Sequence, residues 1–114
     1  MGPQDEGGEG MAKYLLLYGP GRMPETDQER AQVMKAWDGW FTELGKAVVD
    51  PGNPFTPAVK KIAGGGSVSD AKPTAGGYSI LEADSLDQAT TLAKGCPVLQ
   101  GGADITVFET FDVM

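Results

Sequence analysis

Two helix-start signals constrain the fold of this chain more than any other feature of its sequence. Thr26-Asp-Gln-Glu29 and Ser85-Leu-Asp-Gln88 both match the capping box, in which a Ser or Thr and a Glu or Gln three residues later bond to free backbone N–H groups. The first signal predicts an amphipathic helix of about five turns. The second predicts a shorter helix that ends at Gly95 and Pro97. The apolar arc of the first helix consists of Val33, Met34, Ala36, Trp37, Trp40, Phe41, Leu44 and Ala47.

Short apolar runs that are closed by turn residues predict strands around these helices. The runs are 13–18, 47–50, 59–62 and 78–83, followed by a last strand in which Ile105, Val107, Phe111 and Val113 alternate with polar residues. Lysines mark 59–62 as an edge strand, and 64–73 is expected to be a flexible polar connection. The resulting order, βαββαβ, predicts an α+β fold of the ferredoxin-like type, with two helices on one face of an antiparallel sheet.

The other face of such a sheet needs a cover. A second copy of the chain is the simplest source of one, so we expect a homodimer. The 114 residues fit one domain. We expect that domain to span 12–114, and the Gly-rich, acidic stretch 1–11 to be a disordered leader, either native or left over from cloning. No apolar run approaches the ~20 residues of a membrane span.

Composition excludes several function classes. The chain has no histidine, which rules out Ser-His-Asp triads, Cys-His dyads and histidine-based zinc sites. The single cysteine cannot form an internal disulfide, which fits a cytoplasmic protein. The chain has sixteen acidic and nine basic residues, which give a net charge of -7. This charge argues against binding to nucleic acid or to a membrane surface. The acidic residues lack the spacing of a calcium loop, so we predict no metal and no cofactor.

Asp50 is the candidate catalytic residue. It ends a predicted strand, where its carboxylate can serve at a pocket mouth as a general acid or base, with Tyr14 or Tyr18 as a nearby hydroxyl. The alternative is a turn residue whose side chain caps Pro51-Gly52-Asn53. Arg30 lies inside the apolar arc, where it is a candidate anion anchor. Its alternative is a surface role, with the head group paired to an acidic neighbour.

Aromatic residues complete the candidate ligand-binding site. Trp37 with Tyr14, Tyr18 or Phe55 is predicted to line a cleft between helix and sheet, and Asn53 joins them from the turn. The alternative for Trp37 is a plain core position. Cys96 follows a helix C-terminus, which disfavours the thiolate, so we interpret it as a small buried hydrophobe.

Five stretches of the chain are similar to a known family. They are 13–20 (KYLLLYGP), the helix with Trp37 and Trp40, 48–54 (VVDPGNP), 76–84 (GGYSILEAD), and 93–98 (AKGCPV) with Gly101-Gly102. Together they resemble the YCII-related proteins, on the DGPF-domain side. The resemblance implies a dimeric α+β barrel in which two ferredoxin-like subunits pack sheet against sheet. Suspected enzymes of the family carry a histidine on the first helix near an acidic residue; here 34–37 contains none, and the DGPF tetrapeptide itself is absent.

Two function classes follow from these observations. The first is a small-molecule-binding protein, whose catalytic version is an acid–base enzyme of the isomerase, dehydratase or lyase type built on Asp50. The second is a non-catalytic dimeric accessory or regulatory module, in which the Pro and Gly phrases shape turns and the dimer face. A partly polar cleft favours the first, whereas an Asp50 carboxylate bonded to backbone amides favours the second.

Overall fold

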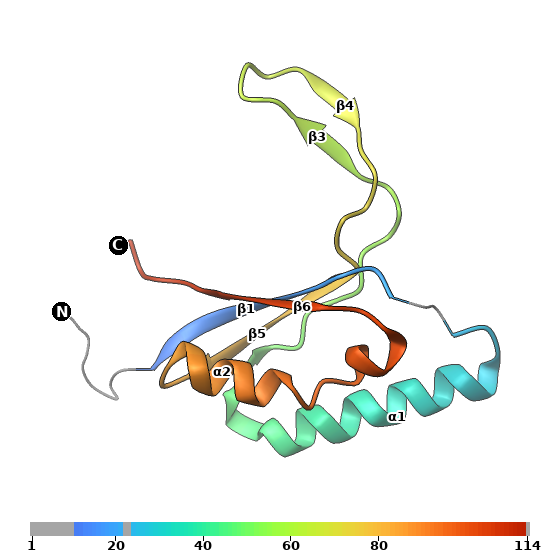
Figure 1. Ribbon diagram of the computed structural model, residues 1–114, viewed down its shortest axis with the longest axis vertical. Coiled ribbons are helices and arrows are strands. Elements are labelled where there is room, and N and C mark those ends of the chain that lie inside the picture. The colour runs from blue at the N-terminus through green and yellow to red at the C-terminus, as the bar shows by residue number, and fades with distance from the viewer. Residues whose placement is uncertain (1–10, 22–23, 114) are drawn as a thin grey trace.

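A four-stranded antiparallel sheet carries both helices on one face (Figure 1). The structure is a computed structural model that describes residues 11–21 and 24–113. Its strands are β1 (Ala12–Tyr18), β2 (Val48–Asp50), β5 (Gly77–Ala83) and β6 (Ile105–Glu109), in the order β2-β5-β1-β6. The helices are α1 (Asp27–Leu44) and α2 (Leu86–Ala93), with short 3-10 turns η1 (Gly45–Ala47) and η2 (Pro97–Gly101). This arrangement confirms the predicted ferredoxin-like α+β fold.

Both capping boxes form. The Thr26 hydroxyl accepts a hydrogen bond from the Glu29 N–H at 3.0 Å, and the Ser85 hydroxyl accepts one from the Gln88 N–H at 3.0 Å. The carboxylate of Glu29 in turn accepts from the N–H of Glu25. The two helices therefore begin where these signals place them. Neither they nor the 3-10 turns, within the described ranges, are long and apolar enough to cross a membrane.

The central strands separate the two faces of the sheet. On β1, Tyr14, Leu16 and Tyr18 are buried under the helices, and on β5 alternate residues from Gly77 to Ala83 are buried on the same side. The intervening residues, among them Leu15 and Leu17, are half-buried on the face that no helix covers. This uncovered side, here termed the open face, is what the predicted homodimer requires.

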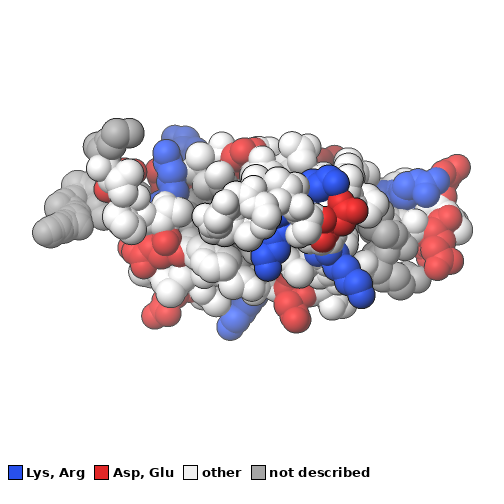
Figure 2. Space-filling view, turned by 90° about the horizontal axis from the view of Figure 1, so that it is seen from above, with Lys and Arg blue, Asp and Glu red and all other residues white. Residues whose placement is uncertain are grey.

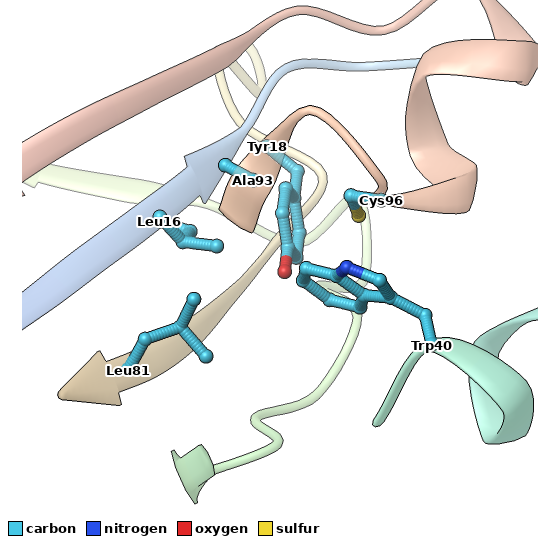
Figure 3. Packing of buried hydrophobic residues seen from close by; sticks show 6 residues of the cluster. All are labelled: Leu16, Tyr18, Trp40, Leu81, Ala93 and Cys96. Carbon is cyan, nitrogen blue, oxygen red and sulfur yellow. The ribbon is translucent and has the colours of Figure 1, made fainter. Parts of the chain in front are cut away.

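The hydrophobic core lies between the sheet and the C-terminal part of α1 (Figure 3). Its buried members are Leu16, Tyr18, Trp40, Leu81, Ala93 and Cys96. The Trp40 ring reaches across to α2, where its indole N–H donates to the Leu92 carbonyl at 3.2 Å. Trp40 thereby joins α1 to α2 by packing and by a hydrogen bond.

The apolar arc of α1 is covered along only part of its length. Trp37, Phe41 and Leu44 pack against the core, but Val33 and Met34 are 39% and 62% exposed. The first turns of the arc are therefore exposed, because the sheet lies under the later turns only (Figure 1).

A separate hairpin replaces the predicted edge strand and flexible connection. Strand β3 (Lys60–Ile62) pairs with β4 (Val68–Asp70) and not with the main sheet. The segment 64–73 is therefore partly strand, which corrects our expectation. The last strand is also shorter than predicted: β6 ends at Glu109, and Phe111 and Val113 beyond it are 82% and 77% exposed. The predicted leader 1–11 lies outside the described residues except for Met11, which is exposed.

Candidate functional site

Asp50 lies at the end of β2 on the open face. It is opposite Ile80 of β5, after a register shift that follows Val48. One carboxylate oxygen, Oδ1, accepts a hydrogen bond from the Gly52 N–H at 2.8 Å. The other, Oδ2, lies 3.5 Å from the hydroxyl of Tyr78, which donates to it. The turn thus fixes the carboxylate while leaving Oδ2 beside a phenol.

Phe55 extends this corner of the molecule. Its ring stacks on that of Tyr78, with ring centroids 5.9 Å apart and an angle of 23° between the ring planes. Backbone bonds hold the two segments together, since the Phe55 N–H donates to the Gly76 carbonyl and the Tyr78 N–H donates to the Asn53 carbonyl. The Asn53 side chain is exposed, and Asn53 contributes to this corner through its backbone carbonyl. We call Asp50, Tyr78 and Phe55 the corner triad.

A cavity of about 540 Å³ opens beside Phe55, at the base of the β3–β4 hairpin. Its walls come from 54–56, 58–60 and 73–75, and they combine apolar groups such as Phe55 and Val59 with Thr56, Thr74 and Lys60. This hairpin-base pocket is open to solvent, and its volume lies within the range of small-molecule sites. Asp50 does not line it, and Phe55 connects the pocket to Tyr78.

A second, smaller groove of about 350 Å³ runs between α1 and η2. Trp37, Val33 and Pro97 form its apolar part, and Gln32 and Gln100 supply polar groups. Trp37 lies edge-on to Tyr18 at 5.5 Å, so one side of its ring belongs to the core and another to this groove. This groove is not the predicted cleft between helix and sheet, since Tyr14, Tyr18 and Phe55 do not line it, and the packing of Trp37 on the core matches the alternative.

Tyr14 and Tyr18 lie on the helix side of the sheet, away from Asp50's face. They are 1% and 5% exposed. The Tyr18 hydroxyl donates to Ser79 Oγ at 2.7 Å, and Ser79 donates to the Pro51 carbonyl at 2.6 Å. Burial raises the pKa of the Tyr18 phenol well above its ordinary value. Both tyrosines act in packing, and Tyr78 occupies the place beside Asp50 that we expected one of them to fill.

Arg30 is on the exposed first turn of α1. Its guanidinium forms an ion pair with Asp27, three residues earlier, and lines neither cavity. The expected single cleft of Asp50, Arg30 and aromatics is therefore not formed, because α1 presents Arg30 to solvent. Cys96 is buried, and burial raises the pKa of its thiol, as suits an inert core residue.

Tyr78 is not among the site residues predicted from the sequence. The alternation within its strand does place it on a partly polar face with Ile80 and Glu82, a pattern that suits either a rim or a cavity. Among the described residues, no group of three or more Cys, Asp or Glu side chains could hold a metal ion.

Comparison with protein-family models matches residues 12–110 to the YCII-related domain. The chain belongs to the YCII-related family. No curated protein matches this YCII-related chain. One similar solved structure is the 5-chloro-2-hydroxyhydroquinone dehydrochlorinase of Burkholderia phenoliruptrix in complex with 2,5-dihydroxybenzoquinone, with 22% identity, a TM-score of 0.49, and coverage of 87% of this chain and 93% of that chain. Another is a dimeric protein of unknown function and ferredoxin-like fold from Bacteroides fragilis, with 14% identity, a TM-score of 0.38, and coverage of 89% and 97%.

Proposed function

We propose that this YCII-related protein is a homodimer that binds a small molecule in the hairpin-base pocket. The observation that carries the proposal is the position of Phe55. It lines the pocket and stacks on Tyr78, whose hydroxyl lies 3.5 Å from the Asp50 carboxylate. A ligand in the pocket therefore contacts the Phe55 ring, and Phe55 connects it to the Tyr78–Asp50 pair, which lies outside the pocket.

The chemistry of these groups selects the ligand class. Phe55 and the apolar walls favour a planar ring, and the Thr56 and Thr74 hydroxyls that line the pocket favour a hydroxyl group on that ring. The net charge of -7 disfavours a carboxylate on the ligand. The ligand class is therefore a small hydroxylated aromatic compound.

Catechol and benzoate test this assignment on the isotope-labelled protein by NMR. We expect catechol to shift the amide signals of residues 55–56, 58–60 and 74–75, and to bind more tightly than benzoate. Phe55→Ala should weaken catechol binding at least ~10-fold, because the stacking ring is lost. Val33→Ala, an equally exposed position in the groove between α1 and η2, is the control. Shifts that follow Val33 and ignore Phe55 would place the site in the other groove and reject the proposal.

The catalytic version of the proposal is an acid–base enzyme of the isomerase, dehydratase or lyase type. In this version the substrate extends past Phe55 out of the pocket, where Asp50 is the base and Tyr78 is a hydrogen-bonding hydroxyl at the reacting group. Asp50→Asn removes the negative charge and keeps the turn, because an amide oxygen still accepts a hydrogen bond from the Gly52 N–H. We expect this variant to fold normally and to lose affinity for catechol.

A non-catalytic accessory module remains the second candidate, and the Oδ1 bond to Gly52 favours it. In that function Asp50 only caps its turn. Asp50→Asn would then leave both stability and catechol binding unchanged. The same variant therefore separates the two functions.

The homodimer is proposed from the open face. Leu15 lies opposite Ile80 on one side and Phe108 on the other, so three apolar residues adjoin across three strands. Two copies that place these faces together remove them from water.

We also propose a cytoplasmic location, since the one cysteine cannot form an internal disulfide. Stretches 48–54 and 93–98 are the basis for proposing that the chain belongs to the DGPF-domain side of the family.

A further inference from the structure

The β3–β4 hairpin stands out from the rest of the molecule (Figure 1). We call residues 58–72 the arm. Its strands pair only with each other, and every residue from 60 to 70 is exposed. Three consecutive glycines, 64–66, lie at its tip. A two-stranded hairpin is marginally stable in water without something to pack against. The arm therefore has the form of an element that lacks its partner.

The arm presents an apolar pair to solvent. Ile62 and Val68 lie directly opposite each other and are 70% and 62% exposed. The alternation of β3 places Lys60 on the same face, next to Asp70 on β4. One face of the arm thus carries an apolar pair followed by an ion pair, a pattern that suits contact with another surface.

The charge of the arm is opposite to that of the chain as a whole. It contains Lys60, Lys61 and Lys72 against one aspartate, whereas the chain has 16 acidic and 9 basic residues and a net charge of -7. Within the described residues, Lys61 and Lys72 form no ion pair. Figure 2, which looks down from the side of the arm, shows basic side chains near the middle of the view, with acidic atoms beside them. A basic arm on an acidic body is complementary to a second acidic body.

We propose that the arm of one copy docks on the acidic body of a second copy. This inference rests on the proposed homodimer and names the element that holds it. The arm points away from its own body, so its apolar pair and the unpaired Lys61 and Lys72 are left for another molecule to contact (Figure 1). Val59 and Lys60 of the arm also line the hairpin-base pocket. A docked arm would therefore hold one wall of the ligand site in place.

Charge reversal tests the docking. The variant K61E/K72E removes the two unpaired lysines of the arm, and K35E/K46E makes the same change in net charge on α1 and η1. Sedimentation equilibrium at low and high salt measures the dimer dissociation constant. We expect K61E/K72E to raise that constant at least ~10-fold at low salt, K35E/K46E to change it less than ~3-fold, and high salt to weaken the wild-type dimer. Equal effects of the two variants, or none from the arm variant, overturn the inference.

A second variant and a cross-linking experiment test the docking by means other than charge reversal. I62T/V68T retains β-branched residues in both strands while removing apolar surface, and we expect it to weaken the dimer as well. Carbodiimide cross-linking of a mixture of 14N and 15N chains should join Lys61 or Lys72 to carboxylates of the other copy. Cross-links within one copy only would reject the docking. A monomeric wild type that still binds catechol would reject both the docking and the dimer but not the pocket.

Discussion

Gly52 is the residue on which the corner triad depends. Its φ is +77°, and a Cβ atom added there would lie 1.7 Å from the carbonyl oxygen of Tyr78. No side chain fits between these two backbone segments. The absence of a side chain lets the turn after Asp50 lie directly on β5, which brings the carboxylate beside the Tyr78 hydroxyl.

Gly52→Ala should therefore destabilise the protein by more than about 3 kcal/mol, because backbone strain at positive φ adds to a steric overlap. Gly39 in α1 is the matched control, since a Cβ there meets nothing within 4 Å. Gly39→Ala should stabilise the helix by about 1 kcal/mol. Urea denaturation followed by tryptophan fluorescence measures both. Similar midpoints for the two variants would show that the turn does not pack as described.

Two buried groups, the Cys96 thiol and the Tyr18 phenol, should make the stability depend on pH in the alkaline range. Burial raises the pKa of Cys96 from its ordinary 9.0 and that of Tyr18 from its ordinary 10.0. The folded state therefore holds both protons more tightly than the unfolded chain does. This contribution to stability is complete below about pH 9 and is lost as the pH rises through the folded pKa values. The urea midpoint should fall steadily from pH 9 to pH 11 and fall less steeply in Tyr18→Phe. A wild-type midpoint that is constant over this range would contradict the prediction.

At the scale of the element, α1 is an asymmetric helix. Its first turns leave Val33 and Met34 in solvent, and its later turns bury Trp40 against α2 and the sheet. The two tryptophans therefore differ in importance, although they are close together on the same arc. Trp40 is 5% exposed and donates a hydrogen bond to Leu92, whereas Trp37 is half-buried beside the groove between α1 and η2.

Trp40→Ala should cost about 3–5 kcal/mol, the usual range for a large buried ring. Trp37→Ala should cost clearly less, because part of its ring already faces water. Thermal and urea unfolding of the two variants give the comparison. If Trp37 proved the more costly of the two, the packing of α1 against the core would need revision.

Local patterns predicted those elements that have a local cause. Both helices begin at capping boxes, which depend only on residues three positions apart, and β1 and β5 are apolar runs with clear ends. Strand β4 was missed because Val68-Ser-Asp70 is short and polar and follows three glycines. Its pairing with β3 is the main cause of its structure. The exposure of the first turns of α1 could not be predicted either, since the reach of the sheet is a tertiary property.

The candidate site was partly predictable for the same reason. Asp50 and Phe55 stand next to turn residues, and the sequence marked both. Tyr14 and Tyr18 were assigned to the site because alternation shows which residues of a strand share a face but not which face receives the helices. In the structure that face is the core, and Tyr78 on the neighbouring strand replaces them.

At the scale of the whole molecule, the sheet has one face under helices and one face open. Leu15 is at the centre of the open face, between Ile80 and Phe108. Leu15→Arg should leave the fold intact, because the side chain does not point into the helix-covered core, and should prevent the dimer. Met34→Arg, at an exposed position of α1, is the control. Light scattering at micromolar concentration should give about twice the chain mass for wild type and Met34→Arg, and the single chain mass for Leu15→Arg. A dimeric Leu15→Arg would show that the copies do not meet at this face.

The central place of β1 has a consequence for how the chain is made. β1 pairs with β5 on one side and with β6 on the other, so Leu16 finds its partner Val107 only near the far end of the sequence. Ribosomes add about 5–20 residues each second, and during those seconds one edge of β1 has no neighbour. A nascent chain in this state exposes an unpaired apolar strand edge, which favours association with other nascent chains or with chaperones. Folding of this sheet is therefore an event that follows synthesis of β6, and its yield in cells should depend on how well β1 is shielded until then.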